Sequence, residues 1–125
     1  APDKPQSGMG HAITIGYPLR LQKSHIMDGV EAWTCSGTPV DCVKMGVHEV
    51  MKSKPDLCVS GVNHGSNSSI NVIYSGTMSA AIEAALEGIP AIFGAQVDKS
   101  RENIEAFLNI LSMIFTFDTF HILIF

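Results

Sequence analysis

The chain has 125 residues, of which 46% are hydrophobic and 16% are charged, and its formal net charge at pH 7 is −4. This length fits one domain, and the high hydrophobicity excludes an intrinsically disordered chain. Eight Lys and Arg residues against twelve Asp and Glu, with no basic run, disfavour a protein that binds duplex nucleic acid. The composition does not exclude binding of small phosphorylated ligands, because backbone N–H groups and a metal ion can hold them without net positive charge.

Three cysteines, Cys35, Cys42 and Cys58, show no CxxC spacing and leave an odd number. In a domain of this size the pattern predicts reduced thiols and a cytoplasmic location rather than a disulfide framework. Cys35 and Cys58 lie inside apolar runs, where cysteine usually acts as a small hydrophobic residue, so packing is favoured over catalysis.

The two ends of the chain are unusual. It begins without Met or a signal-peptide pattern, on the turn-like residues 1–10. From Ala106 onward an apolar stretch is interrupted by Asn109, Asp118 and His121. A membrane span would bury these polar groups at a cost, so we expect a core helix running into a strand, and no membrane association.

The first part of the chain predicts a loop and two extended segments. Residues 1–16 are rich in Gly, Pro and Ser, and Tyr17–Met27 partly alternates apolar and polar residues, which indicates a short extended segment. Val30–Cys35 predicts a strand that Ser36 and Gly37 end.

A helix is predicted directly after this strand. Thr38 has the position of its N-cap, Pro39 is the first helical residue, and Asp41 lies near the positive end of the helix dipole. Lys52–Pro55 ends the helix.

The middle of the chain predicts a second unit of strand, helix and strand. Asp56–Val62 is a short apolar run typical of a strand buried on both faces, and residues 63–77 form a polar loop. Met78–Glu87 is rich in Ala and predicts a helix that Gly88 caps, before another strand over Ile89–Phe93.

The alternation continues with a helix from Arg101 to about Met113, which Ser100 caps. Strands that alternate with helices predict a parallel α/β sheet with right-handed crossovers.

Three loops leave the carboxyl ends of predicted strands, where open parallel sheets bind ligands, and each combines Ser or Thr with Gly. They are SGTPVD (36–41), SGVNHGSN (60–67) and YSGT (74–77). Gly lets the backbone approach an anion, and a helix N-terminus offers unpaired N–H donors, so the loops suit a phosphate. The same residues are also ordinary helix caps, and the pattern favours neither interpretation.

Asn63 directly follows a buried strand, so its amide is expected in the crevice at the strand end. There it can ligate Mg²⁺ or Mn²⁺, or merely close a turn. Of the histidines only His64 is placed to touch a ligand, and a solvated loop position is favoured for it. The five form no HxH or HExxH pattern, which gives zinc poor support: His11, His25, His48, His64 and His121. The absence of GxGxxG and GxxxxGK[ST] argues against dinucleotide and P-loop nucleotide binding.

Four segments together resemble, in order, the survival protein SurE family. They are APDKPQSGMGHAIT, CSGTPVDCV, KPDLCVSGVNHGSN and VIYSGTMSAAIEAALEGIPAI. The resemblance covers residues 1–92 and leaves 93–125 as a divergent tail. It implies a Rossmann-like three-layer α/β sandwich with a mostly parallel sheet, incomplete at both ends in this chain. It also implies a metal-dependent phosphatase of nucleoside 5′/3′-monophosphates, a homodimer or homotetramer in the complete enzyme.

The resemblance assigns site residues by motif. The family holds one divalent ion, Mg²⁺ or Mn²⁺, with a pair of adjacent aspartates, a serine and an asparagine; here the serine is Ser7 and the asparagine is Asn63. The family's YSGT loop lies beside the phosphate, which points to Ser75, Gly76 and Thr77.

Two departures from the family pattern qualify this expectation. The NDDG segment that supplies both aspartates is absent, so the catalytic carboxylates have no counterpart, and Asp3 is a better substitute than Asp41. After Ile92 the sequence leaves the pattern, and the C-terminal region used for subunit exchange is missing. The chain is therefore interpreted as an internal piece that retains metal weakly and is inactive alone.

Two further expectations follow from that interpretation. Without a central first strand, Asp56–Val62 would lose a neighbour and expose an unpaired edge. The alternative function is a non-catalytic, Rossmann-like fragment that binds a nucleotide or another anion.

Overall fold

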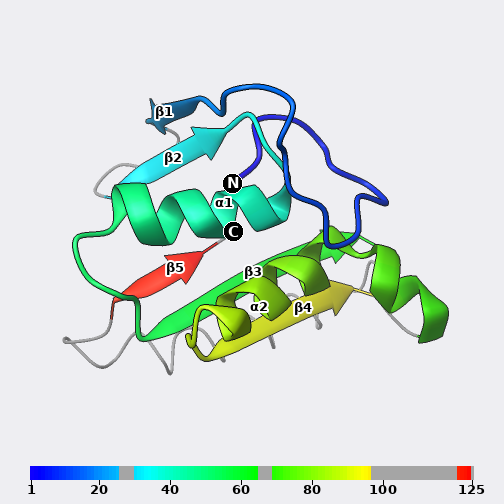
Figure 1. Ribbon diagram of the computed structural model, residues 1–125. Coiled ribbons are helices and arrows are strands. Elements are labelled where there is room, and N and C mark those ends of the chain that lie inside the picture. Colours follow the sequence, from blue (N-terminus) through cyan, green and yellow to red (C-terminus); the bar gives the residue numbers. More distant parts are fainter. Residues whose placement is uncertain (26–29, 65–68, 97–120, 125) are drawn as a thin grey trace.

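A computed structural model of the chain describes residues 1–25, 30–64, 69–96 and 121–124 (Figure 1). Its strands form a three-stranded parallel sheet and a separate antiparallel hairpin. The elements in chain order are β1 (Leu21–Ser24), β2 (Ala32–Cys35), α1 (Pro39–Met45), β3 (Leu57–His64), α2 (Gly76–Leu86), β4 (Ala91–Gln96) and β5 (Ile122–Ile124). Both predicted helices and all four predicted strand segments in the described residues are therefore present, with shifted ends.

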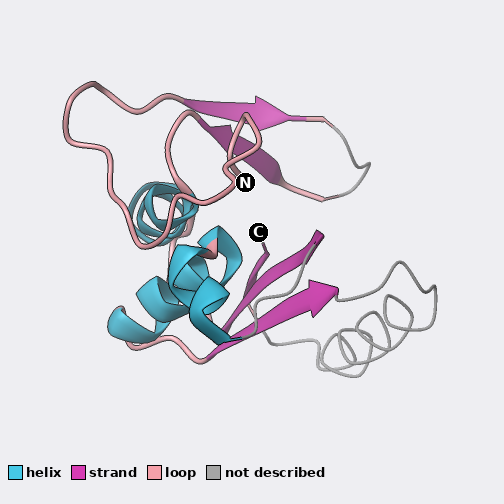
Figure 2. Cartoon of the chain, turned by 90° about the vertical axis from the view of Figure 1, so that its right-hand side faces the viewer, coloured by secondary structure: helices cyan, strands magenta, loops and turns pink. Residues whose placement is uncertain are grey.

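The parallel sheet has the strand order β4-β3-β5, which places β3 in the middle. Cys58 and Val59 of β3 are fully buried, as expected of a strand covered on both faces. Figure 2 shows α1 and α2 on one side of this sheet, with the β1–β2 hairpin beyond α1. The predicted Rossmann-like α/β fold is confirmed, and the described residues contribute one helical layer to it.

The expectation that Asp56–Val62 exposes an unpaired edge is wrong for the first half of that strand. Leu57, Cys58 and Val59 pair in parallel with Ile122–Ile124 on the side away from β4. The backbone of Asp56 extends the contact, because its N–H donates to the carbonyl of His121 at 2.9 Å. Unpaired backbone groups at a sheet edge favour any extended segment that can reach them, and residues of the apolar tail fill this place.

The hairpin extends into the N-terminal residues, which the sequence predicted as loop. Leu21 pairs with Cys35 across the two antiparallel strands. On the other side of Cys35, Pro2 forms a bridge, and Asp3 N–H donates to the Cys35 carbonyl at 2.8 Å. The first residues of the chain are thus held beside β2, which fixes where residues 2–8 begin.

The start of α1 agrees with the predicted capping. The Thr38 hydroxyl accepts from the Asp41 N–H at 3.1 Å, and the Asp41 carboxylate accepts from the Thr38 N–H at 2.8 Å. Pro39 follows as the first helical residue. After Met45 the helix continues as a π-helical turn, Gly46–Val50, which ends just before the predicted stop.

Helix α2 begins two residues earlier than predicted. Ser75 caps it, and a 3₁₀ helix, Ser69–Tyr74, occupies part of the segment predicted as loop. The small side chains of Ala80 and Ala84 are fully buried against α1 and β3, because they allow close approach of the backbones. Gly88 has φ +71°, the left-handed conformation expected just after a helix.

The core lies between α1, α2 and β3. It consists of buried residues from these elements and from the connection between α2 and β4: Val43, Cys58, Ala80, Ala84 and Ile89. All three cysteines are buried and free, as predicted. The predicted helix over 101–113 and its cap Ser100 lie outside the described residues, and no helix within the described ranges is long and apolar enough to cross a membrane.

Asp41 gives a prediction about acid stability. Burial alone would raise its pKa, but hydrogen bonds from Thr14 and Thr38 outweigh burial and hold the pKa below its ordinary value of 3.8. A lowered pKa means that the carboxylate stabilises the fold above its unfolded pKa and loses this contribution as the pH falls through the folded one. Asp41→Asn should lower the free energy of unfolding at pH 7 by about 1–3 kcal/mol and flatten the acid limb. Urea denaturation from pH 2 to 7 measures both effects. Glu49→Gln, at an exposed position, serves as control. If the unfolding free energy depended on pH in the same way in both variants, the stabilising role of the Asp41 carboxylate would be contradicted.

Candidate functional site

A pocket of about 780 Å³ opens where the carboxyl end of β3 meets the first turn of α2. Three segments supply most of its lining: Pro2–Gly8, Ser60–Asn63 and Tyr74–Thr77. The pocket thus has the position in which parallel α/β sheets usually bind ligands, beyond the carboxyl ends of their strands.

The structure brings together all five residues that the motifs singled out. Ser7 lies in the N-terminal segment, Asn63 near the end of β3, and Ser75, Gly76 and Thr77 at the start of α2, and each lines this one pocket. These segments are far apart in sequence, so their convergence is produced by the fold. The roles of metal ligand and phosphate contact stay predictions.

A bulge in β3 places Asn63 on the pocket. Ser60 pairs with Phe93 and Asn63 with Ala95, so two residues of β3 lie opposite one residue of β4. Residues three apart in a regular strand point to opposite faces, whereas Ser60 and Asn63 both line the pocket. Bulges of this kind redirect side chains and are frequent beside functional sites.

Gly61 makes the bulge possible. Its φ is +107°, and a Cβ there would lie 2.5 Å from the Gly94 carbonyl oxygen and 3.2 Å from Thr77 Cγ2. A side chain at position 61 would therefore force β3 away from both β4 and α2.

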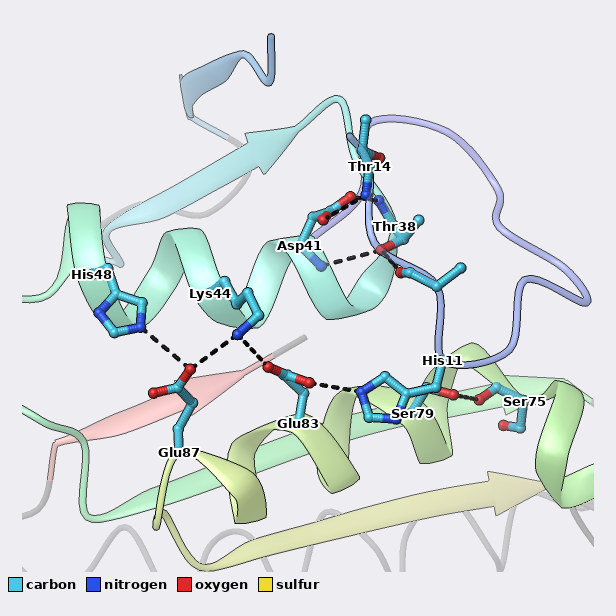
Figure 3. A network of polar contacts seen from close by, with 11 residues as sticks. His11, Thr14, Thr38, Asp41, Lys44, His48, Ser75, Ser79, Glu83 and Glu87 are labelled. Carbon is cyan, nitrogen blue, oxygen red and sulfur yellow. Dashed lines mark hydrogen bonds and ion pairs between the residues drawn. The ribbon is translucent and has the colours of Figure 1, made fainter. Parts of the chain in front are cut away.

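The first turn of α2 forms a second part of the pocket wall, and the N-terminal segment lies close to it: a Cβ built on Gly76 would be 3.5 Å from the Gln6 carbonyl oxygen. The Ser75 hydroxyl accepts from the Met78 N–H at 3.1 Å, and the Ser79 hydroxyl donates to the Ser75 carbonyl at 2.7 Å (Figure 3). The Ser60 hydroxyl donates to the Thr77 carbonyl at 2.9 Å, which ties β3 to α2. Ser75 is thus the helix cap, and the first-turn N–H groups of Gly76 and Thr77 stand at the positive end of the helix.

Two charged residues are present among the described residues that line the pocket, Asp3 and Lys4. The Asp3 carboxylate lies 3.9 Å from the Arg20 guanidinium. Asp41, the other candidate carboxylate, is buried at the start of α1 and accepts from Thr14 N–H at 3.1 Å. Its carboxylate is therefore occupied in capping and does not line the pocket.

The donors in the pocket match a hard divalent cation in kind. Asp3, Ser7 and Asn63 offer carboxylate, hydroxyl and amide oxygens, which Mg²⁺ and Mn²⁺ prefer over nitrogen or sulfur. Their total charge is low, and within the described ranges no group of three or more His, Cys, Asp or Glu side chains is arranged to hold a metal ion.

The sequence analysis gave no individual role to four other residues that line the pocket, although two of them, Ser60 and Tyr74, begin its candidate loops: Lys4, Ser60, Asn71 and Tyr74. Each is within four residues of a residue that was singled out, so proximity in sequence was the available signal. The Tyr74 carbonyl accepts from the Gly10 N–H at 3.1 Å, a contact between distant segments that no local pattern predicts.

Comparison with known proteins agrees with the motifs. The chain matches the model of the family described as survival protein SurE over residues 1–120. It is 72% identical over 93 residues to the 5′-nucleotidase SurE of Cytophaga hutchinsonii and 52% identical over 92 residues to that of Thermosipho melanesiensis. Each of these two matches covers 74% of this chain and 36% of the relative, so the chain spans about a third of the length of these relatives.

The fold gives the same answer. A crystal structure of the SurE protein from Aquifex aeolicus resembles it with a TM-score of 0.72 and 33% sequence identity, over 93% of this chain and 48% of that chain. A parallel sheet whose central strand ends at a pocket beside a helix N-terminus defines a Rossmann-like α/β protein. Within that class, the chain belongs to the survival protein SurE family.

Measurements of folding stability can test whether Ser75, and not Thr77, is the N-cap of α2. Ser75→Ala removes the N-cap of α2 and should lower the free energy of unfolding by about 1 kcal/mol. Thr77→Val keeps the side-chain shape and removes a hydroxyl that caps nothing, so it should change that free energy by less than about 0.5 kcal/mol. Urea denaturation of both variants measures the difference, and a larger loss for Thr77→Val would make Thr77 the cap.

Proposed function

We propose that the residues lining the pocket form part of the active site of an enzyme that hydrolyses nucleoside 5′- and 3′-monophosphates to nucleoside and phosphate. They would bind the phosphate group and the metal ion. The observation that carries the proposal is the convergence of Ser7, Asn63 and the first turn of α2 on one pocket. The relatives named 5′-nucleotidase SurE support the 5′ activity, and the motif resemblance supports the 3′ activity. The same resemblance supports a homodimer or homotetramer, and the three free cysteines support a cytoplasmic location.

The phosphate would lie at the N-terminus of α2. The N–H groups of Gly76 and Thr77 can donate to phosphoryl oxygens there, where the helix dipole favours negative charge. The Thr77 hydroxyl adds a donor, and the Lys4 ammonium, from the N-terminal segment that lines the same pocket, supplies a counter-charge. Donors fixed by the fold before the reaction stabilise charge that develops on the phosphoryl group, which is the main electrostatic contribution to such catalysis.

Asn63 and Ser7 would hold the divalent ion, with Asp3 as the carboxylate within reach of the same pocket. A bound Mg²⁺ or Mn²⁺ supplies charge stabilisation and a more acidic water. The protein residues orient the phosphate: Ser60 holds the Thr77 carbonyl, and the bulge at Gly61 directs Asn63 to the pocket.

One observation favours a second function, a non-catalytic fragment that binds a nucleotide or another anion. Asp3 is the sole carboxylate among the described residues that line the pocket, and it lies near a guanidinium. Anion binding by helix N–H groups needs no carboxylate, whereas Mg²⁺ is usually anchored by one or two.

We therefore expect the 125-residue chain alone to show no metal-stimulated phosphatase activity. One exposed carboxylate cannot match an adjacent pair in charge or geometry. The measurement is release of inorganic phosphate from several nucleoside monophosphates with Mg²⁺ or Mn²⁺, against an EDTA control. Robust turnover that EDTA abolishes would contradict this expectation and assign Asp3 as a sufficient ligand.

A graft tests the enzyme proposal itself. In the graft, residues 1–92 of this chain replace the matching residues of the Cytophaga hutchinsonii 5′-nucleotidase SurE, and all other residues are those of that relative. The graft should hydrolyse nucleoside monophosphates, and Asn63→Ala should raise the Mn²⁺ concentration for half-maximal activity by at least about tenfold. Asn71→Ala removes another amide from the same pocket and is the matched control.

Two results would count against the proposal. An inactive but folded graft would favour the anion-binding fragment. Equal Mn²⁺ titrations for Asn63→Ala and Asn71→Ala would reject Asn63 as a metal ligand.

A further inference from the structure

A buried carboxylate joins three segments of the protein outside the pocket. Glu83 of α2 has a side chain only 7% exposed, and its two oxygens contact different partners (Figure 3). Oε2 lies 2.6 Å from His11 Nε2, and Oε1 lies 2.6 Å from Lys44 Nζ of α1. Glu87, the C-cap residue of α2, contacts Lys44 at 3.2 Å and His48 at 3.3 Å.

Glu83 is ionised at neutral pH in this arrangement. Burial raises the pKa of its carboxyl, but hydrogen bonds from Lys44 and His11 outweigh burial and lower the pKa below the ordinary value. The other groups of this network are Glu83 from α2, Glu87 from its C-cap, Lys44 from α1 and His48 from the π-helical turn. With both imidazoles neutral the five groups carry a net charge of −1, so a proton on His11 brings the network to neutrality.

His11 is close in sequence to the pocket wall. Residues 2–8 line the pocket, and the structure gives residues 4–9 no hydrogen bond to the described remainder of the chain. The wall is therefore held at its two ends. At one end Asp3 is attached to Cys35, and at the other the attachments begin at Gly10 and His11.

The second end has three kinds of attachment. The Gly10 N–H donates to the Tyr74 carbonyl at 3.1 Å, and the Thr38 hydroxyl donates to the Ala12 carbonyl at 2.6 Å. Between them, the contact of His11 with Glu83 joins the wall to α2, the helix whose first turn also lines the pocket. Of these contacts the imidazole alone ordinarily gains or loses a proton between pH 5 and 8.

We propose that His11 is a positioning residue, whose contact with Glu83 fixes the pocket wall of residues 2–8 against α2. The contact holds this wall more tightly when the imidazole is protonated. A protonated imidazole makes a charge-assisted hydrogen bond to the carboxylate, which is stronger than the bond from a neutral ring. The attachment is therefore stronger where the imidazole is protonated than where it is neutral. The attachment of the wall stands without a ligand, whereas its effect on substrate binding rests on the proposed function.

Hydrogen exchange of the 125-residue chain tests the attachment directly. The probe is the protection factor of the Gly10 amide, with the amide of the fully buried Ala84 in the last turn of α2 as the reference for global unfolding. In the wild-type chain, Gly10 protection relative to Ala84 should decrease between pH 6 and 8. His11→Gln keeps a hydrogen-bond donor and removes the charge, so at pH 6 it should lose on the order of tenfold in protection, the value of one charge-assisted bond. It should also lose the pH dependence.

His48→Gln is the matched control. His48 also contacts a carboxylate of α2, but its side chain is 56% exposed and lies outside the pocket and its wall. It should leave the protection of Gly10 and its pH dependence unchanged. The proposal is overturned if His11→Gln retains the wild-type protection and pH profile, or if His48→Gln loses as much.

Kinetics of the grafted enzyme separate this proposal from the proposed function. His11→Gln should raise KM for a nucleoside monophosphate at pH 6 severalfold with little change in kcat, and His48→Gln should change neither. A severalfold loss of kcat in His11→Gln, with KM unchanged, would contradict a positioning role. An inactive graft would contradict the proposed function alone, because the exchange measurement needs no substrate.

Discussion

β3 can end beside α2 only because position 61 carries no side chain. The backbone there has φ +107°, and any Cβ would meet the Gly94 carbonyl oxygen at 2.5 Å and Thr77 at 3.2 Å. This close approach lets the Ser60 hydroxyl reach the Thr77 carbonyl and lets the bulge direct Asn63 to the same pocket. The arrangement of the β3 end and the α2 start therefore depends on one glycine.

The wall formed by residues 2–8 is positioned differently. Residues 2–8 belong to no helix or regular strand, apart from the single bridge between Pro2 and Cys35. Their position comes from attachments at both ends, to β2 through Cys35 and to α2 through His11. The pocket thus combines one rigid side, formed by β3 and α2, with one side whose position depends on polar contacts. Loops held in this way are common where a site must admit and release a ligand.

Local chemistry explains which parts of this structure the sequence could predict. The capping of α1 by Thr38, Pro39 and Asp41 follows from hydrogen bonds between neighbouring residues, and the buried strand follows from its apolar run. The five candidate site residues could be found because motif order and strand ends both pointed to the same edge of the sheet. The start of α2 was placed two residues late because Ser75 and Thr77 are both good caps, and only the fold decides between them.

Long-range contacts explain the rest. The pairing of Ile122–Ile124 with β3 joins residues 65 apart in sequence, and no local pattern distinguishes this edge from another. The contact between His11 and Glu83 spans 72 residues, and each residue alone looks like a solvated charge on a loop or helix. The bulge at Gly61 was equally hidden, because SGVN reads as a regular strand until its pairing with β4 is known.

If the α2 N-terminus and the pocket wall of residues 2–8 bind a phosphate group together, both should respond to the same ligand. The most direct measurement is a titration of the ¹⁵N-labelled chain with inorganic phosphate and with a nucleoside monophosphate, followed by amide chemical shifts. We expect saturable shifts that concentrate on Gly76, Thr77 and residues 6–8 for both ligands, with added shifts elsewhere in the pocket for the nucleotide. Shifts that are absent from Gly76 and Thr77, or spread evenly over the surface, would contradict this expectation.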